Sequence, residues 1–371
     1  MYRRQERLLP REDSLKRIKL VISDFHIGRG RWLEDGSLNP LEQFIYDEKF
    51  IQFLEYYSTG DFHKAEVELI INGDFLNTIQ VDYDEVLPDA LTERGSMEKV
   101  KRIVRGHPEI FESLRKFVKA PHHTITYIYG NHEPGLLWQS VRKYFESVLE
   151  ERINWPGFNY SFDGIYIEHG NQYHTLNRFD PDQLFLSRGM KEPIVNIPWG
   201  TYFVIKFLNR LKLKRPHIDR VQPFGRYLLA AIFFDTGFAI SALFRLANFV
   251  LHRHIEWYPG QENPLITSVN ILRDTTIIPD MGTYAQQVLK KGQYHTVIFG
   301  HSHQAAFRKI GQAQLYVNTG TWNDIIHLDI QNLGRQRRMT YAYIEYDSKG
   351  RPQTRLKIWK GTRLVEEDVI F

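Results

Sequence analysis

The sequence predicts an α/β protein, a layered sandwich around a mixed sheet that is interrupted by a helical insertion. Three observations lead to this fold class. Strand-like and helix-like stretches alternate from about residue 17 to 195, a meander of strands follows residue 277, and a stretch without strand alternation separates the two. With 371 residues, 42% of them hydrophobic, the chain has ample apolar side chains for a core.

Strands are expected where short apolar runs occur. In the first half these runs are Ile18–Ser23, Val67–Asn72, Thr124–Tyr129 and Ile165–His169. In the second half they are His295–Phe299, Gln314–Asn318, Thr340–Tyr346 and Thr354–Lys360. Helices are expected where apolar residues recur every three or four positions, at Pro40–Tyr57, Met97–Lys119, Leu136–Glu151 and Tyr284–Lys291.

This reading divides the chain into a core in two halves, 1–195 and 271–371, and an insertion at 196–270. The insertion opens with an amphipathic helical pattern at Trp199–Leu208 and continues into the nearly all-apolar stretch Tyr227–Leu251. Asp235, followed by Thr236 and Gly237, favours a turn between two helices, because a charge at the centre of a bilayer is costly. A helical hairpin packed on the protein is therefore preferred over an element lying at a membrane surface, and both over a transmembrane helix.

Basic residues are concentrated in the insertion. From Trp199 to Ile255 nine basic residues stand against two acidic ones, Asp219 and Asp235, an excess of seven in a chain whose net charge is +4. Such a segment suits an anionic membrane surface or an amphiphilic substrate that bears phosphate, although a solvated basic helix face fits it equally well. The absence of cysteine and of a visible secretory signal indicates a cytoplasmic protein, peripheral at the inner face of the membrane if the insertion binds lipid.

Five short motifs carry the side chains that bind metals. They are Asp24-Phe25-His26, Gly73-Asp74, Gly130-Asn131-His132-Glu133, His169-Gly170 and Gly300-His301-Ser302-His303. Each follows an expected strand, and the carboxyl ends of strands are where open α/β sheets place their sites. Taken singly, a histidine here is more often a hydrogen-bonded buried residue than a ligand; it is the whole set that predicts a site.

Two hard divalent ions close together require a bridging carboxylate, imidazoles, and further oxygen ligands. Asp24 and His26 stand two apart on a stretch expected to be extended, so both are predicted to project to one side, and the same holds for His301 and His303. Asp74, alone at a strand end, is suited to bridging. Asn131 offers an amide oxygen and His169 an imidazole. The adjacent histidines His122 and His123 could be mistaken for a further metal-binding pair. They lack a preceding strand and a turn glycine, and are interpreted as surface residues.

In order and type, these motifs resemble those of the calcineurin-like metallophosphoesterases. The resemblance implies a four-layer α/β/β/α sandwich and two divalent metal ions, manganese foremost, with iron, zinc or magnesium as alternatives. By motif position it implies that Asp24, His26 and His303 hold one ion, that Asn131, His169 and His301 hold the second, and that Asp74 bridges them. It also implies that His132 contacts the scissile phosphate and assists the leaving oxygen, and that Glu133 orients His132.

The resemblance further implies a hydrolase in which a metal-bridged hydroxide attacks phosphorus in line. The block His169-Gly170-Asn171-Gln172-Tyr173 is similar to one in the branch of UDP-2,3-diacylglucosamine hydrolases, which cleave a lipid-linked pyrophosphate beneath a helical lid. His132 and His174 depart from that branch, which has arginine and aspartate there. A soluble phosphodiesterase or nuclease acting on nucleic acid, a phosphoprotein phosphatase and a non-catalytic scaffold stay open as alternatives.

Overall fold

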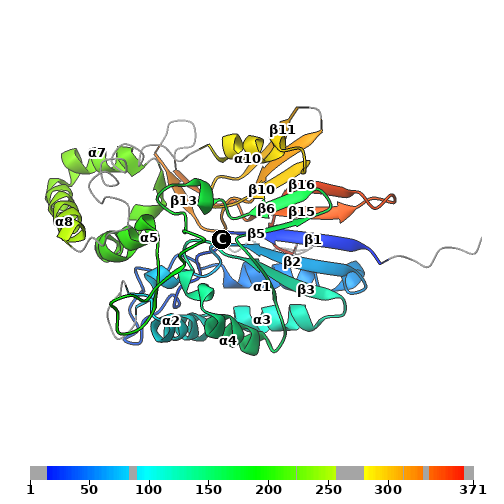
Figure 1. The fold of residues 1–371 in the computed structure, drawn as a ribbon, viewed down its shortest axis with the longest axis horizontal. Coiled ribbons are helices and arrows are strands. Elements are labelled where there is room, and N and C mark those ends of the chain that lie inside the picture. Colours follow the sequence, from blue (N-terminus) through cyan, green and yellow to red (C-terminus); the bar gives the residue numbers. More distant parts are fainter. Residues whose placement is uncertain are drawn as a thin grey trace, which may run out of the picture.

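Two β-sheets packed face to face form the centre of the molecule, with helices on their outer faces (Figure 1). The computed structural model describes residues 15–82, 90–222, 224–255, 280–311, 313–328 and 334–362. Within these ranges the strand order is β16-β15-β1-β2-β3-β4 in the first sheet and β11-β12-β10-β6-β5 in the second. This arrangement confirms the predicted α/β/β/α fold class.

The first sheet is built on a parallel core. Its central strands β1, β2 and β3 run parallel, β4 joins them in the same direction, and β15 and β16 add an antiparallel edge. The strands are β1 (Arg17–Ile22), β2 (Glu66–Asn72), β3 (His123–Ile128), β4 (Asn154–Gly157), β15 (Thr340–Tyr346) and β16 (Pro352–Ile358). Five of these were predicted to within a few residues; β4 was not.

In the second sheet, β10 runs parallel to β6 and β12, while β5 and β11 are antiparallel edges. Its strands are β5 (Asn159–Phe162), β6 (Ile165–Glu168), β10 (Thr296–Phe299), β11 (Ala306–Ile310) and β12 (Gln314–Asn318). Short strands pair elsewhere: β7 (Phe185–Leu186) with β8 (Ile194–Val195), and β13 (Ile325–His327) with β9 (Val221–Gln222) and β14 (Gly334–Gln336).

Three apolar clusters hold the four layers together. Between the sheets, β-branched side chains such as Val21, Ile70 and Ile298 are fully buried. The outer face of the first sheet packs on α1 (Asp47–Tyr56), α2 (Glu93–Gly106), α3 (Pro108–Lys119) and α4 (Gln139–Leu149). The outer face of the second packs on α10 (Met281–Lys290). Because the sheets are covered on both faces, their parallel strands read as continuous apolar runs in the sequence.

Two helix predictions were wrong in extent. The single helix expected at Met97–Lys119 is broken at His107, because the proline that follows disfavours helical backbone at the residue before it and instead starts α3. The helix expected at Pro40–Tyr57 begins only at Asp47. The carboxylate of Glu42 accepts hydrogen bonds from the backbone N–H groups of Gly28 (2.9 Å) and Gly30 (2.7 Å), which ties residues 40–46 to the loop after β1.

The described part of the insertion is mainly helical, with one short strand, β9, that pairs with β13. It contains α5 (Trp199–Phe203), a π-helical turn (Val204–Leu208), α6 (Asn209–Lys212), α7 (Phe224–Phe234) and α8 (Thr236–Ile255). As predicted, the apolar stretch is divided at Asp235. No helix among the described residues is long and apolar enough to cross a membrane. The predicted boundary between the insertion and the second core half, near residue 270, lies outside the described residues.

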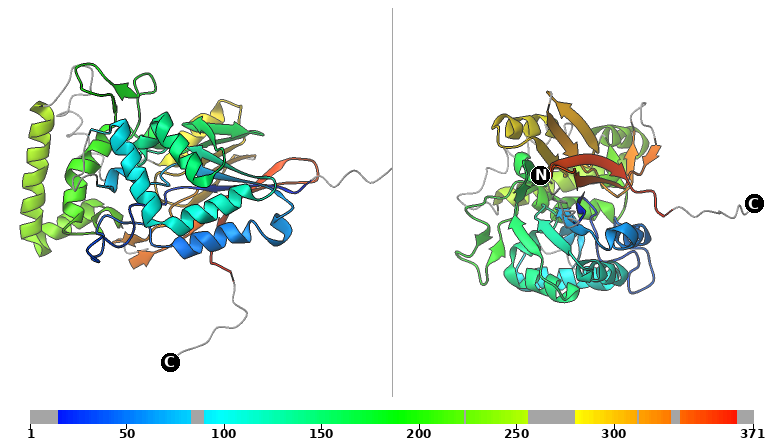
Figure 2. Two further views of the ribbon diagram at one scale, coloured as in Figure 1. Left: turned by 90° about the horizontal axis from the view of Figure 1, so that it is seen from below. Right: turned by 90° about the vertical axis from the view of Figure 1, so that its right-hand side faces the viewer.

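The insertion has its own small core. Aromatic side chains of α5 and the π-helical turn pack against α8, with Phe249 in contact with Trp199, Tyr202 and Phe207. α8 stands at one end of the molecule, and the first residues of β1 lie toward the other (Figure 1 and the left view of Figure 2). One face of α8 is therefore buried in the insertion and the other faces away from the protein.

His107, at the break between α2 and α3, is the centre of a buried ionic cluster. Its Nδ1 lies 2.7 Å from a carboxylate oxygen of Asp47 and its Nε2 lies 3.6 Å from one of Glu42. Burial disfavours the protonated ring, but the hydrogen bonds and charges of Asp47 and Glu42 outweigh it and raise the pKa of His107 to about 9. The cluster joins three helices to the loop that carries Gly28 and Gly30.

We predict that this cluster makes stability depend on pH. Since the pKa of His107 rises on folding, its contribution is fully present below pH 6.5 and is lost as the pH rises to about 9. The shift corresponds to about 3 kcal/mol. The free energy of unfolding in urea should therefore fall over this interval in the wild type but not in His107→Gln. An equal slope in the two proteins would contradict the assignment.

Candidate metal centre

The predicted metal-binding side chains gather at one end of the two sheets. Asp24 follows β1, Asp74 follows β2, Asn131 follows β3, His169 follows β6 and His301 follows β10. The carboxyl ends of these strands meet where the insertion begins (Figure 1). Three groups of potential ligands form there: Asp24 with His26 and His303, Asp74 with His26 and His132, and Asp74 with His169 and His301.

The first group surrounds Asp24. Its Oδ1 lies 3.3 Å from Nε2 of His303. Nε2 of His303 in turn lies 3.0 Å from Nε2 of His26, and Nε2 of His26 lies 3.9 Å from Oδ2 of Asp74. Two imidazole nitrogens at this separation need either a shared proton or a cation between them, because neutral rings cannot both present lone pairs.

The second group lies on the other side of Asp74. Oδ2 of Asp74 is 3.1 Å from Nε2 of His169, and Nδ1 of His169 donates to the backbone carbonyl of Asn72 at 2.8 Å. A hydrogen bond donated by Nδ1 fixes the orientation of the ring and leaves Nε2 as the atom that can bind a metal ion. Asp74 belongs to this group and to the group with His26 and His132, and its bridging position between two ions stays a prediction.

The backbone around these ligands is not extended, which corrects the prediction made for Asp24–His26 and His301–His303. Five ligands adopt left-handed backbone: Asp24 (φ 57°), His26 (φ 54°), Asp74 (φ 52°), His301 (φ 64°) and His303 (φ 58°). Such conformations cost of order 1–3 kcal/mol each and persist where the surroundings impose them. Here Thr321 and Asn323 donate to the backbone carbonyls of Asp24 and Phe25, both at 2.6 Å.

Two glycines allow the motifs to approach each other. A Cβ on Gly73 (φ 74°) would lie 2.6 Å from the ring of His169, and one on Gly130 would lie 2.2 Å from Oδ1 of Asp74. Neither neighbour can move, since both are buried ligands. The glycines of these motifs are thus required by close packing around Asp74.

The electrostatics of the centre favour bound cations. Burial lowers the pKa values of His26 and His301, which favours the neutral rings that metal coordination requires. For His169 the carboxylates of Asp74 and Asp24 outweigh burial and raise the pKa to about 10. The carboxylates thus favour a positive charge beside Asp74, which a divalent ion can supply as well as a proton does.

Unpaired polar atoms show that the residues present fit such ions. Buried atoms without a hydrogen-bond partner include Oδ1 of Asp24, Nδ1 of His26, Oδ1 of Asn131 and Nε2 of His169. Leaving these groups buried and unpaired is costly, whereas metal coordination satisfies them. The donor set is all nitrogen and oxygen, which suits manganese, iron, zinc or magnesium.

His132 and Glu133, adjacent in sequence, occupy different places. The ring of His132 stands edge-on to that of His26, with centroids 4.3 Å apart, and its Nδ1 lies 3.0 Å from Oδ1 of Asn77. Glu133 instead accepts from the backbone N–H groups of Asp74 and Gly130, both at 2.8 Å. The expectation that Glu133 orients His132 is thus corrected: Asn77 holds the ring, and Glu133 holds the loop of Asp74.

A cavity of about 240 Å³ opens beside the ligands. It is lined by Asp74, Asn131, His132, His301 and His303, and also by His174, Asn177, Gly200, Thr201 and Val204. Sequence reasoning missed these last five residues as members of the site. Of these five, His174 is the one that the sequence could have indicated, because it stands five residues after His169. Its Nδ1 lies 3.2 Å from Nε2 of His301.

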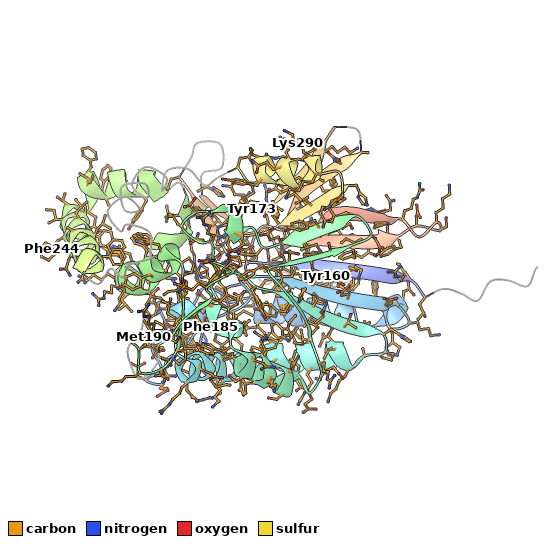
Figure 3. The ribbon with its side chains drawn as sticks, viewed as in Figure 1. Tyr160, Tyr173, Phe185, Met190, Phe244 and Lys290 are labelled. Carbon is orange, nitrogen blue, oxygen red and sulfur yellow. The ribbon has the colours of Figure 1, made fainter. Side chains whose placement is uncertain are left out.

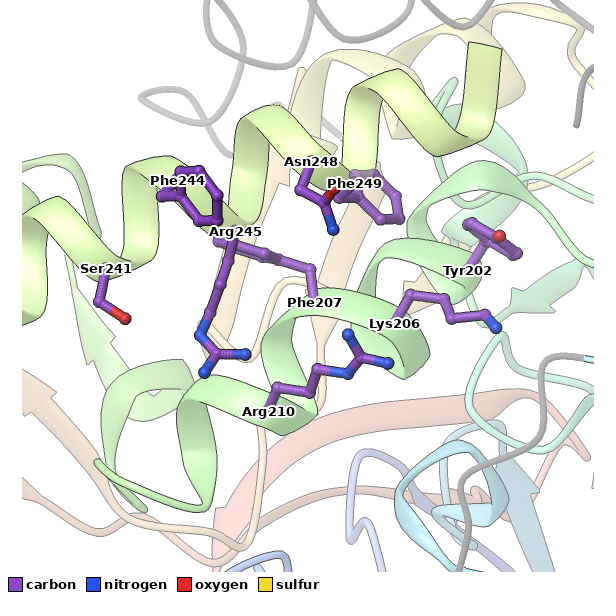
Figure 4. Close-up of a pocket in the computed structure, with 9 residues that line it drawn as sticks. All are labelled: Tyr202, Lys206, Phe207, Arg210, Ser241, Phe244, Arg245, Asn248 and Phe249. Atoms are coloured by element: carbon purple, nitrogen blue, oxygen red, sulfur yellow. The ribbon is translucent and has the colours of Figure 1, made fainter. Parts of the chain in front are cut away.

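A second cavity, of about 400 Å³, lies within the insertion between α8 and the π-helical turn (Figure 4). Its lining includes three cationic side chains and the aromatic residues Tyr202, Phe207 and Phe249. Arg210 and Arg245 extend into the space between the two helical segments, and Lys206 extends toward Tyr202 (Figure 4). Phe244 stands at its rim and projects from the outer end of the molecule (Figure 3).

Comparisons with known proteins agree with this geometry. The sequence model of the calcineurin-like phosphoesterases matches residues 19–305. No curated protein matches the chain. Similar solved structures include a dimetal phosphatase from Danio rerio, with 8% identity, a TM-score of 0.36 and coverage of 92% of this chain and 99% of that chain. Vacuolar protein sorting 29 from Cryptosporidium parvum shows 10% identity, a TM-score of 0.29 and coverage of 93% and 98%. TM-scores this low carry no argument about function.

We predict that Asp74→Ala and His301→Ala abolish tight binding of divalent metal, because each removes a ligand from the centre. Metal content after dialysis against trace manganese, measured by inductively coupled plasma mass spectrometry, should fall by at least one ion per chain. His122→Asn is the matched control, since His122 is an exposed histidine whose left-handed backbone (φ 61°) asparagine tolerates. Full metal content in Asp74→Ala protein would refute the centre.

Proposed function

The chain belongs to the calcineurin-like phosphoesterase family and is a metal-dependent hydrolase of phosphoesters, and we propose that the centre described above is its catalytic site. Asp24, His26 and His303 would hold one ion. Asn131, His169 and His301 would hold the other, with Asp74 between the two sets. The observation that carries this proposal is the convergence of all seven side chains from five strand ends, with four of their polar atoms buried and unpaired.

When bound, the two ions supply an activated water and neutralise charge on the phosphoryl oxygens. His132 stands beside them at the wall of the cavity, with Nδ1 turned to Asn77 and Nε2 left for the substrate. We assign to Nε2 contact with the scissile phosphate and assistance to the leaving oxygen. Glu133 acts only through the loop that it holds around Asp74.

The insertion forms part of the substrate site. Gly200, Thr201 and Val204 line the same cavity as the ligands, and Thr201 donates to the backbone carbonyl of Asn131 at 3.3 Å. A substrate whose phosphorus lies at the metals must therefore extend along the insertion. The chemistry of the insertion accordingly selects the substrate.

That chemistry is amphiphilic. Phe233, Phe234 and Phe244 are 77%, 90% and 75% exposed, and the exposed residues Ile240, Leu243 and Leu251 continue the stripe along α8 at helical spacing. The two acidic side chains between Trp199 and Ile255 already form ion pairs, Asp219 with Lys212 and Asp235 with Arg215. The remaining excess of cations beside an apolar stripe supports an anionic membrane surface as the partner and a lipid-linked phosphodiester or pyrophosphate as the substrate.

The runner-up is a soluble phosphodiesterase or nuclease, in which Lys206 and Arg210 would instead contact nucleic-acid phosphates. A panel of metal-loaded reactions separates the two. It compares a nucleotide-linked lipid pyrophosphate, bis-p-nitrophenyl phosphate, cyclic nucleotides and single-stranded DNA. A kcat/KM highest for the lipid supports our proposal, and one highest for DNA overturns it.

We predict that His132→Ala keeps both metal ions but lowers kcat on bis-p-nitrophenyl phosphate by ~10²-fold or more, since it removes transition-state contacts and no ligand. Asp74→Ala should abolish turnover through lost metal. Metal content and kcat are measured on the same samples. Wild-type kcat in metal-loaded His132→Ala protein would exclude the assigned role.

We predict that the wild type floats with vesicles containing phosphatidylglycerol but not with pure phosphatidylcholine vesicles. The double variant Phe233→Ser, Phe234→Ser should lose ~10-fold or more of this binding, because exposed side chains of α7 would no longer enter the lipid. Phe307→Ser, an exposed residue of β11 that is 45% accessible, is the control. The wild type, the double variant and Phe307→Ser should hydrolyse soluble bis-p-nitrophenyl phosphate at equal rates. Equal flotation of the double variant, or none in the wild type, removes the membrane proposal.

A further inference from the structure

The cavity of about 400 Å³ within the insertion is separate from the metal centre, since no residue lines both this cavity and the one beside the ligands. Two helical segments form it, residues 202–210 on one side and residues 241–249 of α8 on the other (Figure 4). Among the described residues, its lining holds three cationic side chains and no acidic one. The proposed catalytic chemistry gives this cavity no role.

A π-helical turn, Val204–Leu208, shapes one wall of the cavity. Such turns are rare and occur frequently at functional sites. Because their hydrogen bonds join residues i and i+5, residues five apart come to lie on one side of the helix. Tyr202 and Phe207 have this spacing and both line the cavity, together with Lys206. The turn therefore places aromatic rings and a cation on the same wall.

Two guanidinium groups in the cavity lack a counter-ion. Arg210 and Arg245 make no hydrogen bond or ion pair with any residue that the structure describes, and both extend into the space between the two helical segments (Figure 4). The acidic side chains in the described part of the insertion pair with other basic residues. Cations gathered around one cavity repel each other, and an anion between them removes that repulsion.

The chemistry of the cavity matches a phosphate group that carries an apolar body. A guanidinium presents a planar fork of donors that binds phosphate oxygens in pairs. A phosphomonoester has about −1.5 to −2 charges at pH 7, which suits two such groups better than the single charge of a diester does. The aromatic side chains of the lining add apolar surface. The volume lies within the range of ~300–1,000 Å³ that is typical of sites for whole small molecules, so it exceeds the need of an inorganic ion.

The surface beside the cavity indicates where such a ligand comes from. Phe244, at the rim, is 75% exposed, and Ile240 and Leu243 of α8 are exposed near it (Figure 3). Exposed apolar side chains of this kind enter the acyl layer of a membrane, and cationic groups next to them stay at the depth of the lipid phosphates. Deepening the membrane partner of the proposed function, on which it rests, we infer that the cavity binds the phosphomonoester headgroup of an anionic lipid between Arg210 and Arg245.

The direct test is calorimetric titration of soluble dihexanoyl phosphatidic acid into Asp74→Ala protein, whose metal centre cannot capture the phosphate. The lipid should bind saturably, and adding Arg210→Gln with Arg245→Gln should weaken binding by ~10-fold or more. The control pair, Arg188→Gln with Lys214→Gln, removes the same charge from exposed residues outside the cavity and should keep the affinity. No binding, or an equal loss in both pairs, overturns the inference. Displacement of the lipid by inorganic phosphate at equal concentration would assign the cavity to a free anion and overturn it as well.

Vesicles provide a second test, in the metal-loaded wild type. Phosphatidylcholine vesicles carry either phosphatidic acid or phosphatidylglycerol, adjusted to equal zeta potential. The wild type should bind the vesicles with phosphatidic acid ~10-fold more tightly or better. The charge-conserving pair Arg210→Lys, Arg245→Lys should bind both kinds alike, because an ammonium lacks the planar fork.

The outcomes separate this inference from the proposed function. Equal binding of both lipids by the wild type, or a preference for phosphatidic acid that survives in the lysine pair, refutes the headgroup site and leaves the membrane partner standing. Failure to float with either kind of vesicle removes the membrane partner. In that case the soluble lipid alone decides whether Arg210 and Arg245 form a phosphate site.

Discussion

The arrangement of the site depends on the carboxylate of Asp74. It is buried, belongs to two of the three groups of potential ligands, accepts a hydrogen bond from the backbone N–H of His132 and lies 3.1 Å from the ring of His169. A carboxylate in this setting must be balanced by positive charge, because burial of an unpaired charge is prohibitive. The left-handed turns, the absence of Cβ at Gly73 and Gly130, and the two N–H bonds to Glu133 all serve to hold that carboxylate in place.

Around Asp74 the core supplies the potential metal ligands, and the insertion supplies part of the cavity wall. Thr201 and Val204 complete the cavity that the ligands begin, while the outer stripe of α8 exposes phenylalanine beside cationic side chains. Lys212 joins the insertion to the core, since it belongs to α6 and donates to Gln80 in the turn after Asp74.

Most of the fold could be predicted because its strands are buried on both faces and so appear as uninterrupted apolar runs, as at Val67–Asn72. The errors came where tertiary contacts overrode local pattern. Residues 40–46 have helical periodicity, yet Glu42 is used to bind the backbone of Gly28 and Gly30. At His107 the periodicity runs on through a break that Pro108 and the pairing with Asp47 impose.

The sequence by itself determined which side chains form the candidate metal centre, because their types and their places after apolar runs are local properties that folding brings to one edge of the sheets. Only the tertiary structure decided how they are held and oriented. The left-handed backbone at Asp24 depends on Thr321, almost 300 residues away in the chain. The partner of His132 is Asn77, not its neighbour Glu133, because a side chain follows the space and hydrogen-bonding groups that packing leaves to it, and sequence spacing carries no record of either.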